Sequence, residues 1–147
     1  MPSAARSEST EDCPGCGAVL VPLPGSGAVH PGASPSCSRL FEVTLRGPRE
    51  ETGADPAAAE VVALADDAYA AQHLAPGDPL AVRAALGRLL ASLGEPAVPG
   101  GAPRPARWRT TIADVAADLD VIDLSVLVGT WARSVAEDWT SARSAGA

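Results

Sequence analysis

The sequence has 147 residues and a formal net charge of −7, a length that suits one domain with a modest core. Nucleic acid is normally bound by clustered basic residues and repels an acidic chain, so the charge argues against nucleic acid as a partner. Aromatic residues make up only 3% of the chain, so the core must consist mainly of Leu, Val and Ala. A core of this kind gains from an added crosslink, and a bound metal is one way to supply it.

All 11 basic residues are arginine, and only Arg104, Arg107 and Arg109 lie close together. They fall in or beside a stretch rich in Pro and Gly, residues 95–107, which predicts a solvated internal linker rather than a basic binding patch. The polar start of the chain is not a secretory signal, and no apolar run has the length of a membrane span. We therefore expect a cytoplasmic protein without a membrane partner, which leaves a protein or a small molecule as the class of partner.

The N-terminal part of the chain has little helical periodicity. Residues 1–11 are small and polar, and we expect them to be disordered. Residues 13–38 are rich in Gly, Pro and Ser, and within them only residues 18–21 predict a short strand. A loop of 26 residues is uncommon in a compact domain unless something holds it. A metal would do so, and we expect one zinc-binding domain over residues 12–143.

Helical periodicity begins after residue 35 and predicts a mainly α fold of about five helices behind this loop-rich N-terminus. Ser36 or Ser38 is expected to cap the first helix, and the Gly-Pro pair at 47–48 is expected to end it. Asp55 followed by Pro56 predicts the start of the second helix, because an N-cap carboxylate and a proline at the first helical position both favour a helix start.

Three further helices follow in the sequence. The third starts at Pro79 and ends at Gly94. Its expected buried stripe consists of Leu80, Val82, Leu86, Leu89, Leu90 and Leu93. The fourth is short, capped by Thr110 or Thr111, and contains Ile112, Val115 and Leu119. The last follows Asp123 and has an apolar face made of Val128, Trp131, Val135 and Trp139.

A Cys-x-x-Cys pair near the N-terminus, Cys13-Pro-Gly-Cys16, has the spacing of a zinc knuckle. Two residues between the thiolates let both sulfurs reach one ion, and Gly15 and Gly17 let backbone N–H groups turn towards the sulfurs. Three cysteines, an odd number, argue against a disulfide framework in a cytoplasmic protein. The alternatives are unpaired structural cysteines and a thioredoxin-like dithiol. The dithiol is less favoured, because no strand followed by a helix surrounds the Cys-x-x-Cys pair and Cys37 would have no role in it.

A zinc ion in such a site takes four ligands, and Cys37 is the remaining cysteine. The fourth ligand must then be His30, His73 or a carboxylate. His73 lies at the end of a strong helix, where its alternative role is a helix cap, and His30 shares the loop with Cys37. Whichever histidine does not bind the metal would stand beside it as an acid/base or as an outer-shell group.

Several short motifs occur in a fixed order: CPGCGA, HPGASPSCSRLFEV, DAYAAQH, TIADV and TWARSVAEDW. Together they resemble a family of small bacterial proteins, common in actinobacteria, that is known only as a domain of unknown function. The resemblance covers about residues 13–140 and implies a zinc-ribbon-like N-terminus followed by helices, without implying a reaction. It favours a set of metal ligands that consists of Cys13, Cys16, Cys37 and His73. It also implies that His30 and Gln72 lie beside this set.

These observations lead to an expected function. Three cysteines and one histidine form a closed shell that is typical of structural zinc, whereas a catalytic zinc keeps a position open for water. We expect a zinc-binding accessory or binding protein whose Zn²⁺ is mainly structural. The alternative is a zinc enzyme acting on a small molecule in a biosynthetic pathway, with His30 or His73 as acid/base. An anti-sigma factor or redox sensor is less favoured, because the usual His-x-x-x-Cys-x-x-Cys order is absent.

Overall fold

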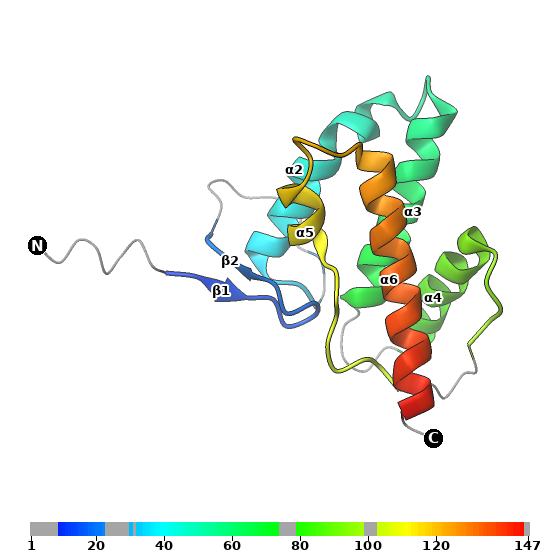
Figure 1. Cartoon of the computed structure of the whole chain (residues 1–147). Coiled ribbons are helices and arrows are strands. Elements are labelled where there is room, and N and C mark those ends of the chain that lie inside the picture. The colour runs from blue at the N-terminus through cyan, green and yellow to red at the C-terminus, as the bar shows by residue number, and fades with distance from the viewer. Residues whose placement is uncertain (1–8, 23–29, 31, 74–78, 99–102, 146–147) are drawn as a thin grey trace, which may run out of the picture.

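The computed structural model describes residues 9–22, 30, 32–73, 79–98 and 103–145, and within them it is mainly helical, as expected (Figure 1). The elements in chain order are β1 (Glu11–Asp12), β2 (Val19–Leu20), α2 (Pro35–Glu51), α3 (Pro56–Gln72), α4 (Pro79–Leu93), α5 (Ile112–Ala117) and α6 (Leu124–Ala145). Among these residues, no helix combines the length and the apolar character that a membrane span requires.

The core lies where α3, α4 and α6 pack against one another. The predicted apolar face of α6 is confirmed, because its four expected residues are all at most 1% exposed: Val128, Trp131, Val135 and Trp139. A buried amide links this face to α3 and to the segment before α5. Gln72 accepts a hydrogen bond from the indole N–H of Trp131 (3.1 Å) and donates one to the carbonyl of Thr110 (2.7 Å). Gln72 is therefore a core residue that fixes the end of α3.

Helix α2 differs from its prediction at both ends. Its N-cap is Ser34, not Ser36 or Ser38, and the Ser34 hydroxyl accepts a hydrogen bond from the Cys37 N–H (3.1 Å). The helix also continues through the Gly-Pro pair at 47–48 to Glu51. A proline removes one backbone donor and favours a kink. Beyond this proline, the last turn contacts α3 through an exposed ion pair between Arg49 and Asp66.

Most other helix ends follow the local signals in the sequence. Asp55 caps α3, and Thr111 caps α5 in a capping box with Asp114. Gly94 follows α4 with a φ of 73°, a left-handed conformation that suits glycine. Helix α6 begins directly after Asp123. Leu119 lies beyond the end of α5 and is 36% exposed.

The prediction of the buried stripe on α4 is wrong at one residue, Leu80. Leu86, Leu89 and Leu90 are buried, but Leu80 is 76% exposed. At 3.6 residues per turn, Leu80 points about 130° away from the centre of the buried leucines, so it cannot share their face. The side chain of Val82 lies outside the described residues.

A two-stranded antiparallel sheet precedes the helices and lies near the N-terminal end of α2 (Figure 1). Strand β2 falls within the expected strand at 18–21, whereas its partner β1 was not expected. Residues 1–8 of the segment expected to be disordered lie outside the described residues, but Glu11 belongs to β1. The Glu11 carboxylate accepts a hydrogen bond from the Ser36 N–H (2.7 Å), which lowers its pKa and ties the sheet to the first turn of α2.

We predict that the substitution Leu89→Ala lowers the free energy of unfolding by about 2–5 kcal/mol, because it leaves a cavity in a fully buried site. Leu80→Ala is the matched control on the same helix, and it should change stability by less than about 0.5 kcal/mol. Urea unfolding followed by circular dichroism measures both. Similar losses in the two variants would contradict the assignment of the buried face of α4.

Candidate metal centre

The Cys13–Cys16 segment forms a tight turn between β1 and β2. The Cys13 N–H donates to the Ala18 carbonyl, and the Gly17 N–H donates to the Cys13 carbonyl, both at 2.9 Å. Gly17 has a φ of 80°, so a side chain at this position would strain the backbone. Backbone hydrogen bonds from Cys16 to the Cys13 sulfur and from Ala18 to the Cys16 sulfur complete the turn. The predicted knuckle geometry, with backbone donors facing the sulfurs, is therefore present.

Gly15 lies close to the end of α3. A Cβ atom on Gly15 would lie 2.5 Å from the Gly32 carbonyl oxygen and 2.7 Å from Cδ2 of His73. Contacts this short require a neighbour to move, so only glycine fits without displacement.

The carbonyl of Gly15 is held by side chains from a distant part of the chain. It accepts hydrogen bonds from the Trp108 indole N–H (2.9 Å) and from Nη2 of Arg104 (3.1 Å). The same nitrogen of Arg104 also donates to the Gln72 carbonyl at the end of α3. Arg104 is exposed, as in a solvated linker, but its guanidinium also joins the knuckle to the end of α3. Arg109 likewise forms an ion pair with Asp138 of α6.

Four side chains converge beneath the knuckle: Cys13, Cys16, Cys37 and His73. All four are buried, and their sulfur and nitrogen ligand atoms lie within 4.8 Å of one another. The Cys16 and Cys37 sulfurs are 3.8 Å apart, and Nε2 of His73 is 3.4 Å from the Cys37 sulfur. The knuckle, the first turn of α2 and the end of α3 each supply part of this cluster, which can hold a metal ion.

His73 is oriented by its own helix. Its Nδ1 lies 2.8 Å from the carbonyl oxygen of Tyr69, and since a carbonyl only accepts, Nδ1 carries the proton. Nε2 is then the free acceptor that faces the sulfurs. The ring also stacks on Tyr69 with a centroid separation of 3.9 Å. These contacts fix both the tautomer and the direction of His73, as is typical of metal-binding histidines.

The electrostatics of the cluster favour a cation. Hydrogen bonds from the Cys16 and Cys37 thiols hold the pKa of Cys13 far below its usual range. The hydrogen bond to Cys13 raises the pKa of Cys16 to about 12, and hydrogen bonds to Cys13 and Cys16, together with burial, raise the pKa of Cys37 further. Three sulfurs this close cannot all be thiolates unless a positive charge lies among them.

His30 stands beside the cluster but is not one of the four converging residues. Its ring lies edge-on to Tyr69, with a centroid separation of 4.9 Å, and 6.0 Å from the ring of His73. Its backbone N–H donates to the Ser38 hydroxyl (3.1 Å). Gln72, which the resemblance also placed near the site, instead turns into the core.

Sequence reasoning did not identify Tyr69, Arg104 or Trp108 as parts of the site. Tyr69 had a usable signal, because it lies four residues before His73 and therefore on the same face of α3. Arg104 and Trp108 had none, because their contacts with Gly15 span 89 and 93 residues of chain.

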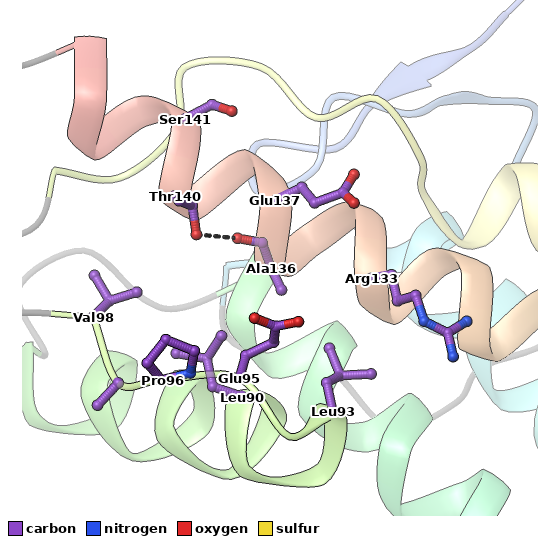
Figure 2. Close-up of a pocket in the computed structure, with 11 residues that line it drawn as sticks. Leu90, Leu93, Glu95, Pro96, Val98, Arg133, Ala136, Glu137, Thr140 and Ser141 are labelled. Carbon is purple, nitrogen blue, oxygen red and sulfur yellow. Dashed lines mark hydrogen bonds between the residues drawn. The ribbon is translucent and has the colours of Figure 1, made fainter.

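A separate pocket lies between α4 and α6 (Figure 2). One wall is α6, with Arg133, Ala136 and Glu137, and the other is the end of α4 with the residues that follow it, including Glu95 and Val98. None of the residues that line this pocket belongs to the cluster of three cysteines and one histidine.

Comparison with known proteins gives one match. The model of a family described as "Family of unknown function (DUF5946)" matches residues 11–99, which is more than half of the chain. The matched region contains the four converging residues, whereas the TIADV and TWARSVAEDW motifs lie beyond it. No curated protein and no solved structure matches the chain.

We predict that Gly15→Ala destabilises the protein by about 1–3 kcal/mol, because the added methyl group overpacks the contact with Gly32 and His73. The matched control is Gly87→Ala in α4, where a Cβ atom would meet nothing within 4 Å. That variant should gain about 0.5–1 kcal/mol from the helix preference of alanine. Equal effects of the two substitutions on the free energy of unfolding in urea would contradict the close packing of Gly15 against Gly32 and His73.

Proposed function

This chain belongs to the DUF5946 family, and we propose that it is a zinc-binding accessory or binding protein in which the metal is mainly structural. The observation that supports this proposal most directly is the buried set of three thiols and one imidazole. Tetrahedral structural zinc sites use this combination of ligands, with all four positions filled by protein atoms. Catalytic zinc sites normally have three protein ligands and a water.

Two of the spacings between ligand atoms, Cys16–Cys37 and Cys37–His73, suit zinc. A tetrahedral ion with Zn–S bonds of about 2.3 Å places neighbouring sulfurs about 3.8 Å apart. The Cys16 and Cys37 sulfurs are 3.8 Å apart. With a Zn–N bond of about 2.0–2.1 Å, sulfur and nitrogen are about 3.5 Å apart, close to the 3.4 Å between Cys37 and His73. Soft thiolate ligands also favour zinc over magnesium or calcium, which prefer oxygen.

The structural role follows from where the four residues come from. Cys13 and Cys16 lie on the N-terminal turn, Cys37 begins α2, and His73 ends α3. When bound, zinc supplies bonds that tie these three segments together, and the binding free energy then contributes to folding. The chain has few large aromatic residues for its core, so such a crosslink adds stability where the core supplies little.

The alternative function is that of a zinc enzyme with His30 or His73 as acid/base. One observation favours it, namely that the ring of His30 lies 6.0 Å from that of His73, inside the same group of aromatic side chains. Against it, His73 fills the fourth position of the cluster, which leaves no ligand position for water. The pocket of Figure 2 is also lined by other residues. The structural role is therefore the better supported one.

The zinc content of the protein tests the proposed metal ligands. We expect the purified wild-type protein to contain one zinc ion per chain, measured by elemental analysis. His73→Ala should lose most of it, because a neutral methyl group cannot replace the fourth donor. His30→Ala is the matched control and should keep its zinc. Equal zinc content in the two variants would refute a site that uses His73 as its single histidine.

The effect of the metal on stability tests the proposed structural role. Removing zinc with a strong chelator should lower the melting temperature, and adding zinc back should restore it, because binding to the folded state alone stabilises that state. Differential scanning calorimetry measures this shift. A metal-free protein with an unchanged melting temperature would contradict the structural role and favour the enzyme.

A further inference from the structure

Three of the four cluster residues have an outer-shell partner supplied by the backbone. The Cys13 sulfur accepts from the backbone of Cys16, and the Cys16 sulfur accepts from the backbone of Ala18. Nδ1 of His73 donates to the Tyr69 carbonyl. Such partners usually set the direction and the electron density of metal ligands.

Cys37 is different because it lies on a helix and not in a knuckle. Its own N–H is used by the N-cap, where it donates to the Ser34 hydroxyl. In place of a backbone donor, the Cys37 sulfur accepts a hydrogen bond from the hydroxyl of Tyr69, with an O–S distance of 3.3 Å. Both residues are almost fully buried, at 0% and 1% exposure, so water does not compete for the sulfur.

The Tyr69 side chain is held firmly in this position. Its ring is stacked between Phe41, at a centroid separation of 3.9 Å and an interplanar angle of 1°, and His73, also at 3.9 Å. His30 packs edge-on against it. Through its hydroxyl, its ring and its carbonyl, Tyr69 therefore contacts two of the four cluster residues, Cys37 and His73.

We propose that Tyr69 is a positioning residue that protects the zinc site, by donating a hydrogen bond that lowers the electron density on the Cys37 sulfur and makes it a poor nucleophile. This inference rests on the proposed zinc site. A metal-bound thiolate still carries lone pairs that can attack an electrophile, and a hydrogen bond to those lone pairs slows the attack. The consequence is a site that keeps its metal when electrophiles or oxidants are present.

Tyr69→Phe tests this proposal because it removes only the hydroxyl and keeps the stacked ring. The zinc-loaded protein is treated with excess iodoacetamide. In this reaction a sulfur lone pair forms an S–C bond, the C–I bond breaks, and iodide leaves. The resulting thioether is a weak zinc ligand, so zinc is released and is measured with a chromogenic chelator.

We expect Tyr69→Phe to contain one zinc per chain and to release it roughly tenfold faster than the wild type. Peptide mass spectrometry should show the order of alkylation. Cys37 should react first in Tyr69→Phe, and after Cys13 and Cys16 in the wild type. A merely structural role for Tyr69 would accelerate all three cysteines together and leave their order unchanged.

Trp108→Phe is the control, because it also removes one donor from the site, but this donor binds the Gly15 carbonyl and not a sulfur. Equal acceleration in the two variants, an unchanged order of alkylation, or a Tyr69→Phe protein that has lost its zinc or its fold would overturn the proposal. Wild-type protein purified without metal would instead refute the proposed zinc site, and this inference with it.

Discussion

The burial of three thiols and one imidazole within 4.8 Å of one another is the constraint on which this structure depends. Sulfur atoms at this separation cannot all ionise without a cation. As neutral thiols in the apolar interior, they would contribute little free energy to folding. The cluster nevertheless lies where the knuckle, α2 and α3 meet, and it joins a loop-rich N-terminus to the helical core. The surrounding features bring these four side chains together. One of them is Gly15, where the knuckle lies close to His73.

The end of α3 is the element that connects this cluster to the core. Consecutive residues there point in different directions, because Gln72 bonds to Trp131 in the core while His73 faces the sulfurs. Tyr69, one turn earlier, stacks on His73 and bonds to Cys37. A shift of α3 by one residue would break both sets of contacts at once. The position of His73 is therefore fixed by the packing of the core.

The sequence predicted the parts of this structure that depend on neighbouring residues. Asp55 and Thr111 cap their helices because capping needs only a side chain and the next few N–H groups. The knuckle cysteines were recognisable for the same reason, since their spacing alone brings two sulfurs together. By contrast, the end of α2 was missed because the helix continues through the Gly-Pro pair at 47–48, which locally favours a helix end, and contacts α3 beyond it through Arg49 and Asp66.

The choice between His30 and His73 could not be made from the residues alone. Both have chemically suitable side chains, and only the packing of α3 under the knuckle decides which nitrogen reaches the sulfurs. The exposed position of Leu80 shows the opposite case, because counting residues around the helix would have revealed it. The choice of histidine depends on contacts between distant residues and could not be predicted from the sequence. The orientation of Leu80 depends only on its position around the helix and was predictable.

The two hydrogen bonds on the Gly15 carbonyl have a consequence for synthesis on the ribosome. They join residues separated by 89 and 93 positions, so the knuckle emerges long before Arg104 and Trp108 do. In general, loop-closure entropy must be lost before such non-local contacts stabilise the fold, which slows their formation. During synthesis the turn can therefore meet α2 and α3 first, and its carbonyl gains these two donors only after residue 108 has been made.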